Sequence, residues 1–338
     1  MFSPRVRARS RYRVIRVSFY VLRFFVGVAE AGFFPGMLLY LTYWFPRTHL
    51  AHFTGYFMVA NPLSFVIGGP LASLILGMDG VAGLHGWQWL FLIEGLPAFL
   101  LAFVVLKLLP DSPSRASWLS SKDKKVTVAR LATEEPVGRP DLWSALRDPR
   151  VLALGVAYFA FAASTYSISL WLPQIVQGMG FSDTATGFVV AMCYVAGIPA
   201  MILCGRSSSR RGERIWHVAL PLLLTTSCLA TASLTQSNAI VLAALAFGLV
   251  ASFAAYGPFF SLPSSILRGT AAAGGIGLFG TIGNFGSFFG PVLIGVLKQG
   301  SGDYATGFAA DALGFGITAL IVLAVGRMLA PRPVLVEA

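Results

Sequence analysis

Long apolar stretches recur along this chain, separated by short polar or basic segments. Four of them contain no Asp, Glu, Lys or Arg, at residues 53–78, 151–182, 184–205 and 269–297. A helix needs about 20 apolar residues to cross a lipid bilayer, and each of these stretches reaches that length. Extended to the whole chain, the pattern predicts nine membrane-spanning helices, near residues 17–45, 53–77, 87–109, 151–176, 185–205, 215–234, 238–260, 271–297 and 304–330.

The composition predicts that lipid, rather than water, surrounds most of the chain. Hydrophobic residues make up 56% of the 338 residues and charged residues only 12%, with a mean hydropathy of +0.73. Soluble domains carry about 25% charged residues. The net charge of +11 does not indicate nucleic-acid binding, because the basic residues lie in short clusters between apolar runs. The chain is therefore predicted to be an all-α membrane protein.

The basic clusters predict the orientation of the spans, since cytoplasmic loops retain Lys and Arg. Alternate connections are basic: nine Lys and Arg lie in residues 107–150 and four arginines in residues 206–214. The intervening connections, such as residues 78–86, carry almost none. The alternation predicts a multi-pass protein of the inner (plasma) membrane, with its C-terminal tail, residues 331–338, in the cytoplasm.

The beginning of the chain breaks this alternation. The pattern puts residues 1–16 outside, yet this basic segment contains six arginines. One interpretation is that residues 1–16 are a non-native start and that helices belonging upstream are absent. The other is a first helix inserted against the charge rule. We favour the first interpretation.

A proline-punctuated polar segment at residues 110–150 predicts a cytoplasmic linker between two helical bundles. It separates a partial N-terminal bundle of three helices, residues 17–109, from a C-terminal bundle of six helices, residues 151–330. Asn61 and Asn284 are each followed by Ser-Phe and Gly-Pro pairs, and their spans lie six helices apart. That spacing is typical of transporters built from two parallel six-helix halves.

Arg23 and Glu30 are charged residues within the first predicted span. A charge near the centre of a membrane helix costs at least about 2.5 kcal/mol, so such residues normally face a bundle interior or an aqueous cavity. Seven residues make two helical turns, which puts both side chains on one face, about 10 Å apart along the axis. An anionic substrate at Arg23 and a proton on Glu30 would neutralise them. Alternatively, Arg23 extends to the membrane surface, or either residue pairs with a side chain of another helix.

Other polar residues within the spans are candidates for lining a substrate route. These are Asn61, Tyr166, Gln174 and Asn284. Hydrogen bonding to a neighbouring helix is the alternative role for Asn284. Gln174 follows Trp171 and Pro173, so the aromatic belt at the membrane surface is an alternative setting for it. Glu94 lies close to an outer interface, where we expect a structural role.

No metal ion or cofactor is predicted. Residues 275–280 match the pattern GxGxxG, but no strand precedes them and a membrane-length apolar run follows, so helix packing explains these glycines better than nucleotide binding. His49 and His52, in a short basic loop, have no ligand partners in the sequence.

Several motifs together resemble the anion:cation symporter family of the major facilitator superfamily. The segment Arg23–Gly36 resembles the fourth helix of that family. The likeness extends through the segments Tyr40–Arg47, Trp87–Pro97, Trp171–Gln174 and Gly283–Pro291. The nearest likeness is to bacterial tartrate-type carboxylate transporters. A complete member has twelve helices, so the resemblance implies that the first three are absent here.

The resemblance also implies roles for individual residues. In that family an arginine and a glutamate seven residues apart on the fourth helix are associated with organic anion binding and proton coupling, and they match Arg23 and Glu30. An asparagine of the eleventh helix that contacts the substrate matches Asn284. The implied mechanism is alternating access, in which two bundles rock about a site at mid-membrane.

The sequence therefore favours a proton-coupled symporter of a small organic anion, such as tartrate or a sugar acid. A truncated, inactive or regulatory membrane fragment of such a transporter is the alternative. A membrane-embedded enzyme is disfavoured, because the four histidines are scattered in loops and no convergent catalytic set is evident. The substrate's identity and the oligomeric state are left open.

Overall fold

The computed structural model describes residues 4–132, 147–267 and 269–329. Within these ranges the chain is helical and forms no strand. The α-helices are α1 Pro4–Glu30, α2 Phe33–Trp44, α3 Arg47–Met58, α4 Ala60–Leu76, α5 Gly86–Leu108, α6 Ser121–Ala132, α8 Pro149–Gly178, α9 Asp183–Arg211, α10 Ile215–Leu234, α11 Asn238–Ala254, α12 Tyr256–Ile266, α13 Gly269–Ser301 and α14 Ala305–Leu329. Two short 3₁₀ helices are η1 Val81–Gly83 and η2 Pro113–Arg115.

The described residues contain nine helical segments long and apolar enough to span a membrane, which confirms the predicted number. They are Val17–Trp44, Thr48–Gly68, Gly86–Leu108, Pro149–Gly178, Ala185–Arg211, Ile215–Leu234, Asn238–Ile266, Gly274–Ser301 and Ala305–Met328. Their bounds differ from the predicted ones mainly where helices continue into basic segments. Helix α3 already begins at Arg47, and α9 continues to Arg211, where Gly212 ends it with a left-handed φ of 64°.

The predicted boundary at residue 16 does not interrupt the first helix, because α1 begins at Pro4 and runs through it. The predicted linker contains η2 and α6 in its first part, while residues 133–146 lie outside the described residues. Tyr40 on α2 donates its hydroxyl to the carbonyl oxygen of Pro110, at 2.9 Å, and Trp44 stacks on Trp118. The start of the linker is therefore attached to the end of α2.

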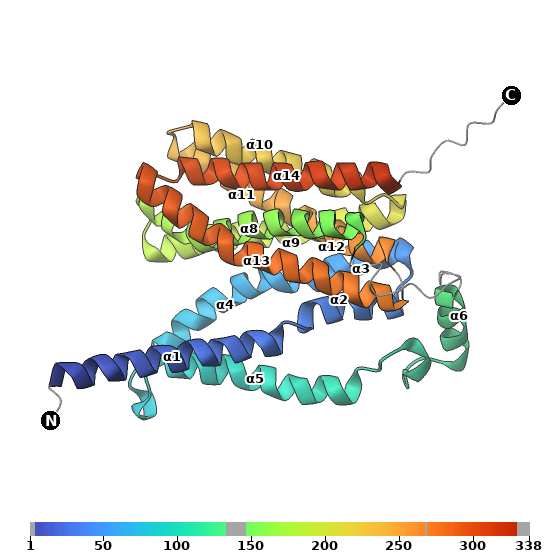
Figure 1. The fold of residues 1–338 in the computed structure, drawn as a ribbon, viewed down its shortest axis with the longest axis horizontal. Helices are drawn as coiled ribbons and strands as arrows, with labels where there is room; N and C mark the ends of the chain where they lie inside the picture. The colour runs from blue at the N-terminus through green and yellow to red at the C-terminus, as the bar shows by residue number, and fades with distance from the viewer. Residues whose placement is uncertain (1–3, 133–146, 268, 330–338) are drawn as a thin grey trace.

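The C-terminal spans form a closely packed bundle (Figure 1). Helix α13 lies along α8 at a distance that only glycine permits: a Cβ at Gly286 would come within 2.0 Å of the carbonyl oxygen of Phe159. A Cβ at Gly290 would come within 2.1 Å of the Ala163 carbonyl oxygen. Such small-residue seams let membrane helices approach closely and gain dispersion energy.

The N-terminal helices are arranged differently. Helices α2 and α3 pack against α9, α12 and α13 of the C-terminal bundle, whereas α5 contacts mainly α4. Figure 1 shows α1 and α5 at one side of the molecule, away from the bundle formed by α8 to α14. Their apolar surfaces are exposed in the described structure, as expected for surfaces that face lipid or further protein.

Candidate functional site

Three spans are interrupted, each at a proline. Pro35, Pro62 and Pro258 lie just after the breaks between α1 and α2, α3 and α4, and α11 and α12. A proline ring meets the carbonyl of the residue four positions earlier and supplies no N–H, so it disrupts the helix there. Membrane proteins tolerate such interruptions where the freed backbone is buried in protein or lines a cavity. The breaks therefore mark the region between the two groups of helices as the candidate site.

Glu30 is the last residue of α1 and stands directly at the first break. Its side chain is exposed, and no basic side chain of the described residues forms an ion pair with it. Arg23 is also exposed, with its guanidinium 5.3 Å from the ring centroid of Phe19, one turn earlier on the same helix. Both side chains are thus available to a solute, a proton or another helix.

Asn284 and Glu30 lie near a contact between α13 and α2, each a few residues from it in the chain. Gly280 approaches Pro35 of α2, because a Cβ at Gly280 would lie 3.9 Å from the Pro35 Cβ. Glu30 precedes Pro35 by five residues, and Asn284 follows Gly280 by four, on spans that run in opposite directions. Asn284 therefore lies one helical turn from that contact along α13, while the break between α1 and α2 lies between Glu30 and Pro35. Asn284 is exposed.

The other predicted site residues do not gather into one cluster with Glu30. Tyr166 and Gln174 are exposed on α8, about 12 Å apart along its axis. Asn61 is half-buried in the first turn of α4, immediately after the second break. Its backbone carbonyl oxygen accepts a hydrogen bond from the Ser64 hydroxyl at 2.7 Å. Glu94 is exposed on α5.

An aromatic cluster joins α2 to the C-terminal bundle, and no motif in the sequence points to it specifically. Phe34 of α2 lies 5.2 Å from Phe260 of α12 and 6.5 Å from Tyr158 of α8, measured between ring centroids. Tyr158 stacks on Phe279 of α13 at 4.6 Å. Since Phe34 follows Glu30 by one turn, the cluster forms a floor beneath the candidate site and joins the two groups of helices.

Beyond this floor, the helices are closed on the side that the basic loops predict to be cytoplasmic. Gly55 of α3 and Gly257 of α12 pack so closely that a Cβ at Gly257 would lie 2.9 Å from the Gly55 Cα. Arg206 of α9 donates hydrogen bonds to His52 and to Tyr56 of α3. Helix α1 makes no comparable contact with the C-terminal bundle. The described arrangement is therefore closed toward the predicted cytoplasm.

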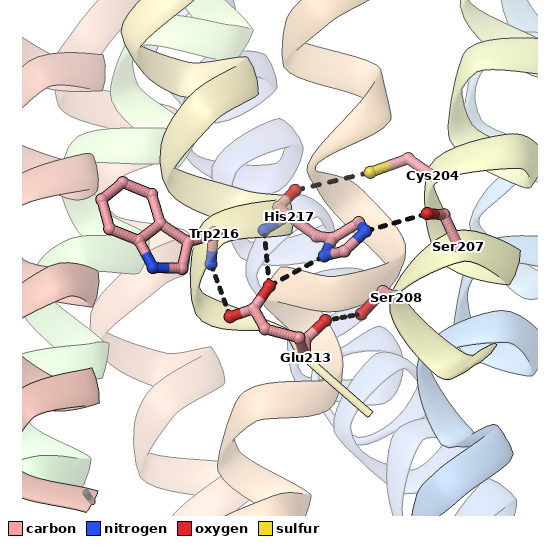
Figure 2. A network of polar contacts seen from close by, with 6 residues as sticks. All are labelled: Cys204, Ser207, Ser208, Glu213, Trp216 and His217. Carbon is pink, nitrogen blue, oxygen red and sulfur yellow. Dashed lines mark hydrogen bonds and ion pairs between the residues drawn. The ribbon is translucent and has the colours of Figure 1, made fainter. Parts of the chain in front are cut away.

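The corner between α9 and α10 carries a polar network, shown in Figure 2. The Glu213 carboxylate accepts hydrogen bonds from the backbone N–H of Trp216 and of His217, at 2.8 Å and 3.3 Å. The His217 ring lies between Glu213, with Nδ1 2.8 Å from Oε2, and Ser207, with Nε2 3.0 Å from Oγ. Glu213 thus satisfies free N–H groups in the first turn of α10, which fixes the corner.

This network corrects the expectation that the histidines are scattered in loops. His217 lies in α10 and His52 in α3. The order Ser207, His217, Glu213 resembles a catalytic triad, but the helix cap made by Glu213 gives the network a structural reason. Among the described residues, no group of three His, Cys, Asp or Glu side chains is placed to hold a metal ion.

Comparisons with known proteins agree with this architecture. The model of the Major Facilitator Superfamily matches residues 13–291. The chain is 41% identical over 314 residues to a protein of Agrobacterium vitis named "Putative tartrate transporter", covering 92% of this chain and 70% of that protein. It is 40% identical to the quinolone resistance transporter of Acinetobacter baumannii, covering 86% of this chain and 68% of that protein.

Solved structures show the same fold. The proton:xylose symporter XylE superposes with a TM-score of 0.63 at 16% identity, covering 85% of this chain and 66% of that one. The human organic anion transporter MFSD10 superposes with a TM-score of 0.59 at 18% identity, covering 84% of this chain and 66% of that one. Given the family match and these likenesses, the chain belongs to the major facilitator superfamily, a family of membrane transporters rather than enzymes.

Proposed function

We propose that this protein transports a small organic anion, of the tartrate or sugar-acid class of carboxylates, together with a proton by alternating access. The observation that carries the proposal is the position of Glu30. It is an acidic residue at the break of a membrane-spanning helix, four residues before Phe34 of the aromatic floor that Phe34, Tyr158 and Phe260 form.

In this proposal Glu30 binds and releases the coupled proton, because a membrane carboxylate without a cationic partner is stabilised by protonation. Arg23, two turns toward the outside, attracts the carboxylate of the substrate. Asn284 contacts the bound anion, and Asn61, Tyr166 and Gln174 contact it along the route. The bundles at residues 17–109 and 151–330, which the linker at 110–150 connects, move relative to each other. The protein lies in the inner membrane, with its C-terminal tail on the cytoplasmic side.

The names of the relatives support a transported carboxylate without fixing it. Relatives at 41% and 40% identity carry the names of a tartrate transporter and a quinolone resistance transporter. A carboxylate is favoured because Arg23 offers a permanent positive charge near the membrane's apolar core, which a neutral solute would leave uncompensated.

Uptake into proteoliposomes tests the proposal. We expect labelled tartrate, or another small dicarboxylate or sugar acid, to accumulate when the outside is acidic. Glu30→Gln should abolish proton-driven accumulation but retain exchange of substrate across the membrane, since glutamine imitates the protonated acid. The matched control is Glu94→Gln, which neutralises an exposed acid on α5 and should leave accumulation unchanged.

Two outcomes would contradict the proposal. Proton-driven accumulation that persists in Glu30→Gln would exclude Glu30 as the coupling residue. Absence of both uptake and exchange of every tested carboxylate, by correctly inserted protein, would instead favour a non-transporting or regulatory membrane subunit.

A further inference from the structure

Hydrogen bonds join the N-terminal helices to the C-terminal bundle near the start of α3 and the end of α9, on the side that the basic loops predict to be cytoplasmic. Nε of Arg206 donates a hydrogen bond to Nε2 of His52, at 3.2 Å, and the same guanidinium bonds the hydroxyl of Tyr56. The backbone N–H of His52 donates to Oγ of Ser209, at 2.9 Å. One arginine side chain and one histidine therefore join parts of the chain about 150 residues apart.

The backbones of α3, α9 and α12 approach closely around this contact, at glycine residues. A Cβ at Gly205 would lie 3.1 Å from the carbonyl oxygen of Ala51. One at Gly257 would lie 2.7 Å from the same oxygen. Because α3, α9 and α12 are in backbone contact here, the bonds made by Arg206 join two surfaces that are already packed together.

The hydrogen bond from Arg206 requires a lone pair on Nε2 of His52. The ring must therefore be neutral, with its proton on Nδ1. Protonation would place an N–H against the guanidinium, removing the bond and setting two positive charges about 3 Å apart.

The groups that face the His52 ring do not offset such a charge. From α9 they are Arg206 and Arg210, and from its own helix His49 and Tyr56. Helices α2, α4 and α12, which also pack on α3, contain no Lys, Arg, His, Asp or Glu.

We propose that His52, Arg206 and Tyr56 form a pH-sensitive latch that keeps the transporter closed toward the cytoplasm while His52 is neutral and releases it when His52 binds a proton. The latch deepens the proposed function, because it would let protons on the cytoplasmic side favour opening toward that side. Histidine is suited to this role, since it titrates between about pH 5 and pH 8.

The network of Figure 2 gives the latch a rigid base. Ser207, the neighbour of Arg206, is held by His217, which is itself held by Glu213 at the start of α10. Arg206 therefore moves with the C-terminal bundle, and a change at His52 acts on the distance between the two groups of helices.

A distance measurement across the latch tests this in the full chain. Spin labels are attached at Thr48→Cys and Met328→Cys, two exposed positions on α3 and α14, after Cys193, Cys204 and Cys228 are replaced by serine. The protein is placed in lipid nanodiscs, and distance distributions are recorded at pH 8 and pH 5. We expect a longer-distance population to increase about tenfold relative to the closed one at pH 5, the effect of losing one charge-assisted hydrogen bond.

Three variants identify the responsible group. His52→Gln retains a neutral acceptor for Arg206, so it should remain closed at both pH values. His49→Gln, the matched control, removes an exposed neighbouring histidine and should keep the response. Tyr56→Phe keeps the ring but loses the bond to Arg206, so it should raise the open population at pH 8.

The proposed latch is contradicted if the spin-labelled protein without further substitutions shows the same distances at both pH values. It is equally contradicted if the pH response persists in His52→Gln. It is also wrong if the response disappears in His49→Gln instead. The readout needs neither substrate nor transport. A pH-driven opening without carboxylate uptake would thus support the latch and contradict the proposed function, and carboxylate uptake with pH-independent distances would do the reverse.

Discussion

Helices α5 and α8 are both long enough and apolar enough to span a membrane, yet they meet opposite environments. No residue in the apolar window of α5 is buried, whereas 61% of the window of α8 is buried. Helix α8 packs on α13 and α14, while α5 contacts mainly α4. The more apolar of the two helices is therefore the less buried one.

The difference shows that apolarity does not determine helix contacts in a membrane. Lipid tails are as apolar as leucine side chains, so burying an apolar face against protein gains little from the hydrophobic effect. The α8–α13 seam is distinguished instead by glycines: Gly286 and Gly290 admit the facing backbone, and Gly283 admits the ring of Tyr158. Packing and hydrogen bonds should therefore dominate the stability of the C-terminal bundle, and substitutions in α5 should matter little.

The largest expected contrast comes from removing an aromatic ring in each region. Phe279 is fully buried and stacks on Tyr158, whereas Phe99 is 61% exposed. Phe279→Ala should lower the free energy of unfolding by about 3 kcal/mol, because it leaves a cavity that the packed helices cannot fill. Phe99→Ala should cost well under about 1 kcal/mol, since lipid can occupy the space. Unfolding by SDS titration in mixed micelles measures both, and equal losses would contradict the comparison.

A methyl group added to a glycine in each region gives the next largest contrast. The Cβ of Gly290→Ala would meet the carbonyl oxygen of Ala163, while nothing lies within 4 Å of a Cβ at Gly95. Gly290→Ala should therefore destabilise the protein by about 2 kcal/mol through overpacking. Gly95→Ala should be neutral or slightly stabilising, because alanine is the better helix former. Thermal unfolding followed by size-exclusion chromatography distinguishes them, and a stable Gly290→Ala would show that the seam can widen.

Sequence reasoning predicted the nine spans because crossing a bilayer requires a minimum apolar length that can be counted. It missed the helix breaks, although Pro35, Pro62 and Pro258 were visible, because other prolines such as Pro97 and Pro221 lie inside continuous helices. Whether a proline breaks a helix depends on what surrounds the freed carbonyl, which is a tertiary property.

The candidate site was predictable only in part, for the same reason. Glu30 and Asn284 could be singled out because polar residues are rare in spans, and both side chains are exposed in the structure. Their roles, like those of Arg23, Asn61, Tyr166 and Gln174, stay predictions. The contact of Arg206 with His52 could not be foreseen, since it joins two helices that are distant in sequence.

The smallest expected effect concerns how the two regions begin their helices. Asp148 caps α8 and also accepts hydrogen bonds from the Arg150 side chain, the shortest at 2.6 Å. That bond, helped by the backbone N–H of Arg150, holds the pKa of the Asp148 carboxyl below its ordinary value. Asp148→Ala should cost about 1 kcal/mol. At the start of α5, Gln88 accepts from the exposed backbone N–H of His85, and Gln88→Ala should cost less.

The pH dependence separates charge from capping at Asp148. A carboxyl whose pKa is lowered by folding contributes its full stabilisation above the unfolded pKa, about 3.9, and loses it as the pH falls through the lower, folded value. The stability difference between the parent and Asp148→Asn, which still caps, should thus be constant from pH 7 to about pH 5 and shrink below about pH 4. The exposure of Arg150 keeps this difference small, well under about 1 kcal/mol. A difference that grew on acidification would mean that the charge of Asp148 destabilises the folded protein and that its bond with the Arg150 side chain adds no net stability.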